Sequence, residues 1–259
     1  MSEQNGGAPR WGIWGPIISL GEAMRFLTII PQPWLPPASE ASMVAAIPWF
    51  PAAGAIIGAM LLPAGWLGDQ GWGSLARAAL LVAAWGVITS GLHLDGLSDT
   101  FDGVMSWRPR ERKLEIMRDS RIGAMGAIAL VVVLLLKFAF LAGAGPRWWQ
   151  AVLVAPVLGR WADCYGIFWF PPAREGGLGR SFNALVRRAD FWAASAFSLA
   201  FAVAAAGPSG LVAALLVWAG SHLLARWWVS DLGGLTGDTY GALSELGEVI
   251  ALAAITWGA

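Results

Sequence analysis

Long apolar runs separated by short polar segments dominate the chain. A helix needs about 20 apolar residues to cross the hydrocarbon core of a bilayer. Such runs recur along the sequence, although prolines interrupt the first run and the last run is short. The candidate spans are 44–67, 75–97, 122–144, 148–171, 190–207, 208–230 and 245–259. Because the runs are too long and too continuous for barrel strands, they predict an all-α, polytopic helical bundle with six or seven transmembrane helices.

The segment before the first span has a different pattern. In 16–30 the apolar residues recur at helical spacing around a Glu and an Arg, which indicates a helix at the membrane interface. No linker or internal repeat divides the chain. We therefore expect a single membrane domain over 1–259, with a cytoplasmic and interfacial N-terminal segment (1–43) followed by the transmembrane part (44–259).

The composition supports a membrane protein. Hydrophobic residues make up 57% and charged residues 13% of the chain, whereas soluble domains carry about 25% charged residues. The 17 Trp and 33 Gly residues also fit, because Trp gathers at membrane interfaces and Gly is frequent in spanning helices. A formal net charge of zero gives no general attraction to nucleic acid. The expected partner is the lipid bilayer, and a homo-oligomer is left open.

Basic residues are concentrated in alternate loops. Six lie in 98–121 and four in 172–189, whereas the intervening loops hold only Arg77 and Arg147. Because positive loops stay in the cytoplasm, this bias places the N-terminus, both basic loops and the loop 231–244 on the cytoplasmic side.

Three aspartates follow the second apolar run in the stretch GLHLDGLSDTFDG (91–103). On a helix that turns 100° per residue, Asp95, Asp99 and Asp102 share an arc of about 60°. Like charges on one face repel each other and are disfavoured near hydrocarbon. A divalent cation would remove both problems, and Mg²⁺ binds carboxylate oxygens together with phosphate oxygens. The cluster predicts a Mg²⁺ site, and the alternative is that the acids cap or solvate a helix end.

A second acidic group lies in DLGGLTGDTYGALSELGE (231–248). Asp238 and Glu245 are seven residues apart and would share one face of a helix. The glycines predict that the preceding segment is a loop. This group either completes a metal site with the first acids or caps the last helix.

Two arginines follow the first acidic cluster in RERKLEIMRDSRIGAMG (110–126). Arg118 and Arg121 are three apart at a predicted helix start, where Asp119 and Ser120 could act as caps. Guanidinium groups bind phosphate through paired hydrogen bonds, so this pair is a candidate phosphate clamp. The alternative is a pair of basic residues that reach toward the lipid headgroups.

Charged residues also occur within the apolar runs. Arg160 precedes Asp163 by three residues, which favours a mutual salt bridge. Lys137 lies in mid-span, where a charge indicates either a functional site or a partner on another helix. His93 faces away from Asp95 and is expected to be structural or interfacial, with substrate binding as the alternative.

Together these residues resemble the cobalamin synthase family, the adenosylcobinamide-GDP ribazoletransferases of vitamin B12 biosynthesis. Five motifs carry the resemblance, in the family's order from about residue 22 to the end: GLHLDGLSDTFDG, LEIMRDSRIGAMG, PVLGRW, PPAREGGLG and GGLTGDTYGALSE. The resemblance implies Mg²⁺-dependent transfer of adenosylcobinamide phosphate from adenosylcobinamide-GDP to α-ribazole or its 5′-phosphate, releasing GMP. It also implies a bacterial inner-membrane enzyme, and the distribution of basic residues predicts that its active site faces the cytoplasm.

Phosphoryl chemistry depends on charge neutralisation and positioning, which suggests a role for each group of residues. The expected metal ligands are Asp95, Asp99, Asp102, Asp238 and Glu245. The first three of these, with Arg118 and Arg121, are the expected catalytic residues. The two arginines would hold the diphosphate and stabilise GMP as it leaves. Weaker candidates for substrate binding are Arg160, Arg174, His93 and Lys137.

Other membrane protein classes also place acids near spans. CDP-alcohol phosphotransferases need a longer spread of aspartates with an Ala-Arg pair between them, and membrane prenyltransferases use paired aspartate-rich motifs near an Asn. The stretch DGLSDTFDG has neither feature. A divalent-cation transporter would carry acids near the membrane midplane, whereas these acids lie at one end of a run, beside arginines.

Overall fold

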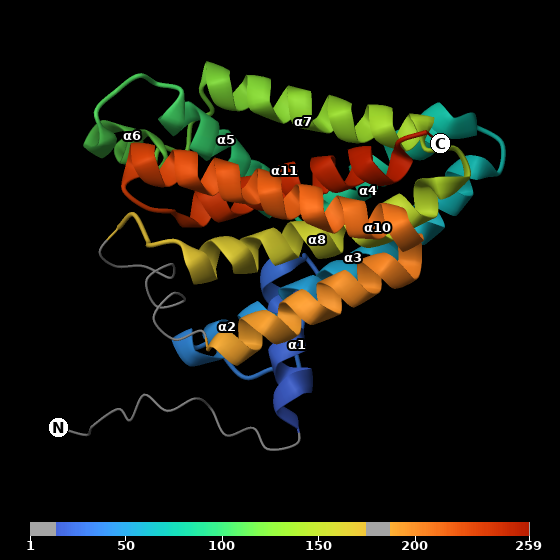
Figure 1. Cartoon of the computed structure of the whole chain (residues 1–259), viewed down its shortest axis with the longest axis horizontal. Helices are drawn as coiled ribbons and strands as arrows, with labels where there is room; N and C mark the ends of the chain where they lie inside the picture. The colour runs from blue at the N-terminus through green and yellow to red at the C-terminus, as the bar shows by residue number, and fades with distance from the viewer. Residues whose placement is uncertain (1–13, 175–186, 259) are drawn as a thin grey trace.

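The apolar runs form helices that lie side by side in a bundle (Figure 1). The computed structural model describes residues 14–174 and 187–258. The helices in these residues are α1 (Gly15–Leu27), α2 (Glu40–Ala46), η2 (Ile47–Trp49), α3 (Phe50–Asp69), α4 (Gly73–Ile88), α5 (Leu92–Val104), α6 (Arg110–Ile116), α7 (Ala124–Gly143), η3 (Gly145–Arg147), α8 (Trp148–Trp169), α10 (Arg188–Leu232) and α11 (Gly237–Thr256). The predicted all-α fold is confirmed.

Four helical segments of the described residues are long and apolar enough to cross a membrane: Glu40–Asp69, Ala124–Gly143, Gly145–Trp169 and Arg188–Leu232. A fifth is added only if α4 and α5 are counted as one bent span. The predicted total of six or seven spans is larger for two reasons. It included α11, whose acidic residues lower its mean hydropathy, and it counted the two arms of α10 as separate spans. The backbone of α10 does break, at Gly207 (φ 58°, ψ −136°), and its two arms fold back on each other (Figure 1).

The predicted second span, 75–97, is not one continuous helix, because α4 ends at Ile88. Ser90 and Gly91 have left-handed φ values of 53° and 65°, and α5 then starts at 89° to α4. A left-handed Gly costs little because it has no Cβ. The acids therefore lie on a separate helix, α5, which runs in a different direction from α4. We treat α5 as lying outside the membrane-spanning helices.

The predicted loop 231–244 is also mostly helical. α10 continues to Leu232, and α11 begins at Gly237, where Thr236 and Thr239 form a capping box. The predicted loop 98–121 likewise contains the end of α5 and all of α6. In the predicted loop 172–189, residues 175–186 lie outside the described residues.

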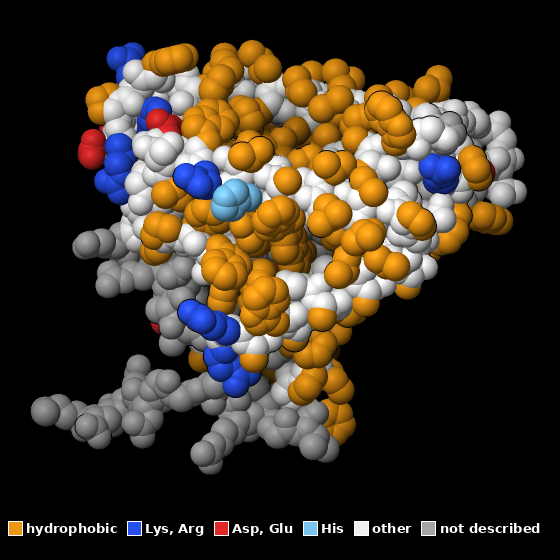
Figure 2. All heavy atoms as spheres, viewed as in Figure 1, with side chains coloured by type: hydrophobic (Ala, Val, Ile, Leu, Met, Phe, Trp, Pro, Cys, Tyr) orange, Lys and Arg blue, Asp and Glu red, His pale blue; other side chains and the backbone are white. Residues whose placement is uncertain are grey.

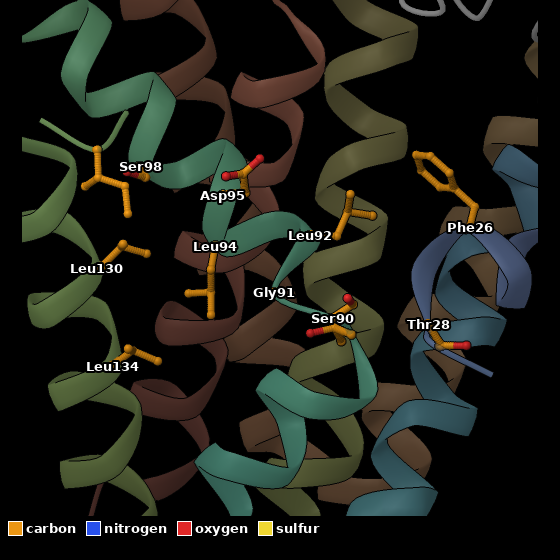
Figure 3. A pocket seen from close by; sticks show the side chains of 12 residues that line it. Phe26, Thr28, Ser90, Gly91, Leu92, Leu94, Asp95, Ser98, Leu130 and Leu134 are labelled. Atoms are coloured by element: carbon orange, nitrogen blue, oxygen red, sulfur yellow. The ribbon is translucent and has the colours of Figure 1, made fainter. Parts of the chain in front are cut away.

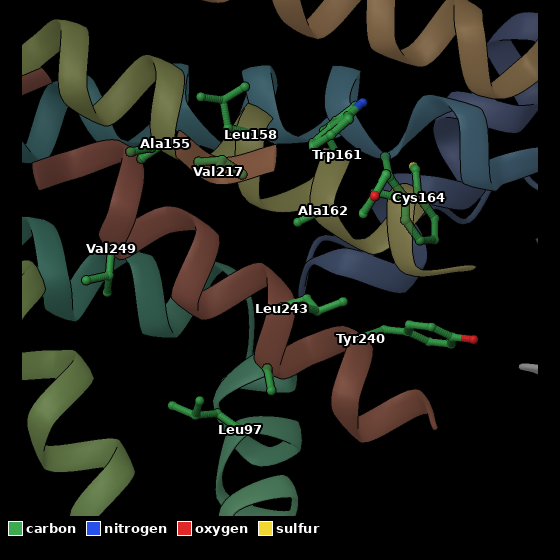
Figure 4. Packing of buried hydrophobic residues seen from close by; sticks show 14 of the residues in the cluster. Leu97, Ala155, Leu158, Trp161, Ala162, Cys164, Val217, Tyr240, Leu243 and Val249 are labelled. Atoms are coloured by element: carbon green, nitrogen blue, oxygen red, sulfur yellow. The ribbon is translucent and has the colours of Figure 1, made fainter. Parts of the chain in front are cut away.

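The core is built around α8 and α11. Leu158, Trp161 and Ala162 of α8 pack with Val217 of α10 and with Leu243 of α11 (Figure 4). The helix expected over 16–30 is present as α1, which packs against α2 and α3. Residues of α1, α5, α8 and α11 line one cavity, next to which the candidate site lies.

The outer surface is apolar along the sides of the bundle. Val131 and Leu135 of α7, and Leu215 and Leu223 of α10, are exposed. Apolar side chains cover the face formed by these helices, and Lys and Arg gather toward the end near α6 (Figure 2). So large an apolar surface is typical of a protein surrounded by lipid, which agrees with the predicted membrane location.

Candidate active site

The acids of the first cluster all lie on α5, as the helical spacing predicted. Asp95 is exposed, and Asp99 and Asp102 are half-buried. Gly91 has a left-handed backbone that ends the turn before α5. The chain therefore changes direction there, and the acidic face of α5 is turned toward α7 and α11 instead of continuing along α4. Asp99 makes no hydrogen bond or ion pair with the described residues, so its carboxylate is available to a ligand.

Asp102 has a structural role that the sequence analysis missed. Its Oδ2 accepts a hydrogen bond from the backbone N–H of Gly123 (2.7 Å), and its Oδ1 accepts one from Gly126 (2.8 Å). These are free N–H groups of the first turn of α7. The caps expected from Asp119 and Ser120 are wrong, because Gly123 is the N-cap residue of α7. A side chain at Gly123 or Gly126 would collide with the Asp102 carboxylate.

Asp238 joins the cluster from the first turn of α11. Its backbone lies against Gly96 of α5, and Thr236 Oγ1 donates a hydrogen bond to Asp238 Oδ2 (3.2 Å). Burial, followed by the charges of Asp95, Asp238 and Asp102, raises the pKa of Asp99 to about 7. The structure therefore brings carboxylates from α5 and α11 close enough to repel one another.

Arg174, which is not part of the predicted clamp, lies within ion-pair distance of these acids, and Arg118 of the clamp acts on them from farther away. Arg174 donates to the Leu114 carbonyl (3.0 Å) and lies 4.0 Å from Asp238 Oδ2. The positive charge of Arg118 also acts on Asp238. Arg118 lies in the turn between α6 and α7 and is exposed, not at a helix start as predicted.

Arg121 is exposed and pairs with Asp119 instead of the clustered acids. Its side chain is 86% exposed and lies 2.5 Å from Asp119. Hydrogen bonds from Arg121 lower the pKa of Asp119 to about 2. The structure thus favours Arg118 with Arg174, and not Arg118 with Arg121, as the pair near the acids.

Glu245, Lys137 and Arg160 form a separate buried network. Lys137 Nζ lies 2.6 Å from Glu245 Oε2 and contacts Glu248, which in turn pairs with Arg160. The predicted metal ligand Glu245 is therefore engaged by Lys137. Lys137 also lies 4.5 Å from the centre of the Trp85 ring. The predicted substrate-binding roles of Lys137 and Arg160 do not fit this arrangement, since each is buried among its partners.

The predicted pairing of Arg160 with Asp163 is wrong as well. Arg160 pairs with Glu248, a residue that the sequence analysis missed, and Asp163 lies 3.6 Å from His93 Nε2 instead. The spacing of Glu245 and Glu248, one turn apart on the same face of the last helix, was the signal that could have revealed this network.

The donor set at the cluster fits Mg²⁺ held partly by substrate. No group of three or more His, Cys, Asp or Glu side chains in residues 14–174 and 187–258 is arranged to hold a metal ion by itself. Mg²⁺, however, is usually bound by one or two carboxylates together with substrate phosphates and water. Asp95, Asp99 and Asp238 offer the hard oxygen atoms that such shared binding needs, whereas both oxygens of Asp102 already accept backbone hydrogen bonds.

Two pockets meet at Asp95. The larger, of about 650 Å³, lies between the end of α1, the α4–α5 turn and α7, and includes Thr28, Ser98 and Leu134. Asp95 and Ser98 of α5 line it opposite Leu130 and Leu134 of α7 (Figure 3). The smaller, of about 220 Å³, lies among α1, α3, α5, α8 and α11. Substrates bound in both pockets would come together at the carboxylates.

Comparisons with known sequences identify the family of this chain. A sequence model of the cobalamin-5-phosphate synthase family matches residues 19–256. The adenosylcobinamide-GDP ribazoletransferase of Roseiflexus sp. (strain RS-1) is 62% identical over 253 residues, covering 97% of this chain and 94% of the relative. The enzyme of the same name from Herpetosiphon aurantiacus is 53% identical over 237 residues, covering 91% and 95% respectively. No solved structure matches significantly. The chain belongs to the cobalamin-5-phosphate synthase family.

Proposed function

We propose that this protein is an adenosylcobinamide-GDP ribazoletransferase that acts in the final stage of cobalamin biosynthesis. Relatives of that name cover nearly the whole chain. The observation that supports the proposal is the meeting of α5 and α11, where the charges of Asp95 and Asp238 act on Asp99 and Arg174 lies 4.0 Å from Asp238. Acids that bind a cation, next to guanidinium groups that bind phosphate, suit transfer at a diphosphate.

The chemistry follows from these charges. The ribose 3′-hydroxyl of α-ribazole, or of its 5′-phosphate, attacks the phosphorus on the cobinamide side of the diphosphate. A new phosphodiester forms, the bond to the GMP oxygen breaks, and the proton of the hydroxyl passes to a carboxylate of the cluster. Arg118 and Arg174 offset the charge that develops on the departing GMP. Mg²⁺, held by Asp95, Asp99 and Asp238, would supply further charge neutralisation at the diphosphate.

The same proposal includes the membrane side on which the reaction occurs. The basic segment 108–121 lies beside the acids, and arginine-rich segments remain on the cytoplasmic side of bacterial inner membranes. We therefore place the N-terminus and the site in the cytoplasm, where nucleotide substrates are available.

A reconstituted assay tests the proposal. Purified protein in lipid nanodiscs should release GMP from adenosylcobinamide-GDP only when an acceptor and Mg²⁺ are both present. Omission of either one is the control, and parallel assays with α-ribazole and its 5′-phosphate identify the preferred acceptor. Absence of GMP release from folded protein under all these conditions would overturn the proposal. Mg²⁺ uptake into sealed vesicles without substrate would instead indicate a transporter.

A further inference from the structure

The smaller pocket is lined by a buried carboxylate whose hydrogen-bonding capacity is not used. Asp163 of α8 lines this pocket and is 2% exposed, and neither of its oxygens makes a hydrogen bond within the described residues. Buried polar groups in folded proteins nearly always have a partner, and an unpaired carboxylate is among the most costly groups to bury. A ligand that supplies hydrogen-bond donors to Asp163 would remove this cost.

The polar neighbours of this carboxylate do not satisfy it. Asp163 Oδ2 lies 3.6 Å from Nε2 of His93, another residue of the pocket wall, and this separation is too long for a hydrogen bond. Arg160 and Ser244 also act on Asp163, but Arg160 pairs with Glu248 and donates a hydrogen bond to Ser244 (3.3 Å). A carboxylate offers about four acceptor positions, so a single donor such as the Ser244 hydroxyl leaves most of them to a ligand.

The rest of the pocket suits a flat base that is attached to a charged group. Phe26 and Phe50 line it, and their rings stack with centres 5.8 Å apart and planes 16° apart. Aromatic side chains of this kind stack on nucleic-acid bases. Asp95 and Asp238 of the carboxylate cluster line the pocket as well. One cavity therefore joins Asp163, two aromatic rings and the acids that are proposed to hold Mg²⁺ and the diphosphate.

The size of the pocket and the donors of each candidate group decide the ligand. The pocket encloses about 220 Å³, whereas pockets for whole drug-sized molecules enclose about 300–1,000 Å³, so it has room for one base and none for a corrin ring. Guanine carries N1–H and the N2 amino group side by side on one edge, and two parallel N–H donors match a carboxylate. Dimethylbenzimidazole in its nucleoside has no N–H group, and adenine has an acceptor nitrogen beside its amino group. Guanine is therefore the base that suits Asp163.

We propose that the smaller pocket binds the guanine of adenosylcobinamide-GDP, with its N1–H and N2 amino groups donating hydrogen bonds to the Asp163 carboxylate. This inference rests on the proposed function, since it assigns one part of the donor substrate to one pocket. The diphosphate then extends from the base toward Asp95 and Asp238. The larger pocket, which shares Asp95, is left for other parts of the two substrates. Asp163 becomes the residue that selects guanine.

Inhibition by nucleoside monophosphates tests recognition of the base. GMP, IMP and XMP share the ribose and the phosphate, but IMP lacks the N2 amino group and XMP has a carbonyl oxygen in its place. Formation of the cobalamin product is the readout, so that added GMP does not interfere with the assay. The inhibition constant of the wild type should be about tenfold higher for IMP than for GMP, as loss of one hydrogen bond to a charged group predicts. It should be about a hundredfold higher for XMP, whose oxygen would face the carboxylate.

Asp163→Asn tests the residue. The new amide can accept from N1–H, but its NH₂ group now opposes the N2 amino group of GMP and matches the carbonyl oxygen of XMP. The preference for GMP over XMP should therefore fall about a hundredfold or more. Glu248→Gln is the matched control, since it also neutralises a buried carboxylate near Arg160 but does not line either pocket. Any loss in this control should affect both nucleotides equally and leave their ratio within about twofold of the wild type.

The outcomes separate this inference from the proposed function. An active wild-type enzyme that GMP, IMP and XMP inhibit equally would overturn the guanine assignment and leave the activity intact. An unchanged ratio of GMP to XMP in folded Asp163→Asn would also overturn it, because another group would then recognise the base. If Asp163→Asn fails to fold, Asp163→Glu takes its place. That variant keeps the charge but displaces the carboxylate by one methylene group, so an unchanged preference for GMP over IMP would overturn the assignment. Absence of activity in the wild type would instead contradict the proposed function, and this inference with it.

Discussion

Asp102 caps the first turn of α7, because its Oδ2 accepts a hydrogen bond from the backbone N–H of Gly123 at 2.7 Å. Its other oxygen accepts the hydrogen bond of Gly126, so one carboxylate satisfies two free N–H groups of a helix that would otherwise need a cap of its own. The motifs SDTFDG and DSRIGAMG therefore meet in space, and the negative charge of Asp102 lies at the positive end of the α7 dipole.

We expect Asp102→Asn to reduce stability. The amide retains one acceptor oxygen and places an NH₂ group opposite the second backbone N–H, at a cost of about 1–3 kcal/mol for the unsatisfied groups. Thermal unfolding in detergent measures the change, and hydrogen exchange at Gly123 and Gly126 should become faster. Asp119→Asn is the control, since within residues 14–174 and 187–258 its side chain pairs with exposed Arg121. Equal stability of the two variants would contradict the capping role.

Asp99→Asn should abolish turnover and leave the fold intact. Asp99 makes no hydrogen bond or ion pair with the described residues, so the substitution removes a charge that the fold does not use. Loss of one ligand at a shared metal and phosphate site should reduce kcat about a hundredfold or more. GMP release and the unfolding temperature, measured on the same preparation, provide the test. Near-normal turnover would exclude Asp99 from the site.

Activity should need more Mg²⁺ as the pH falls. Because the pKa of Asp99 is raised to about 7, this carboxyl becomes protonated as the pH drops below neutrality, and protons then compete with the cation. The Mg²⁺ concentration for half-maximal rate should rise between pH 8 and pH 6, by up to about tenfold per pH unit below 7. A titration at each pH measures this, and a constant Mg²⁺ requirement would contradict the prediction.

The two arginines of the motif MRDSRIG should differ in importance. Arg118 acts on Asp238 together with Arg174, whereas Arg121 is exposed and paired with Asp119. Arg118→Ala should lower kcat/KM about a hundredfold, as expected for loss of a charged group at a transferring phosphate. Arg121→Ala should stay within about threefold of the wild type, in line with the small effects of exposed ion pairs. A larger loss in Arg121→Ala than in Arg118→Ala would reverse the assignment.

Lys137→Met should destabilise the protein strongly. It leaves Glu245 and Glu248 buried without their lysine partner, and removal of one member of a buried ion pair costs about 3–5 kcal/mol. The double variant Lys137→Met with Glu245→Gln should recover part of this loss. Unfolding temperatures in a fixed detergent compare the variants. If Lys137→Met lost turnover without loss of stability, a substrate-binding role would be supported instead.

The apolar runs predicted several helices well because lipid requires continuous helices of limited length. The runs 122–144 and 148–171 correspond to α7 and α8, and the boundary between 190–207 and 208–230 falls at the break in α10. The turn that separates α5 from α4 was missed. The backbone there depends on left-handed Ser90 and Gly91, and an apolar pattern carries no information about φ.

The candidate site was predicted in part. Helical spacing correctly placed Asp95, Asp99 and Asp102 on one helix, because that geometry is local. The grouping of Glu245 with Asp238 assumed that a shared face means a shared partner. Two turns of helix separate these residues, so Glu245 reaches Lys137 while Asp238 reaches α5. The tertiary arrangement of the whole bundle determines which helix packs against each turn of α11. The pattern of residues along the sequence does not contain that information.

The buried network of Lys137, Arg160, Glu245 and Glu248 also has a consequence for biogenesis. The ribosome makes both cations, on α7 and α8, long before it makes the acids of α11. Until that C-terminal segment is released and docks, the nascent chain holds these two positive charges in apolar surroundings without the glutamates that pair with them in the folded protein. Loss of α11 through a premature stop codon would make that intermediate permanent and expose it to membrane quality-control proteases.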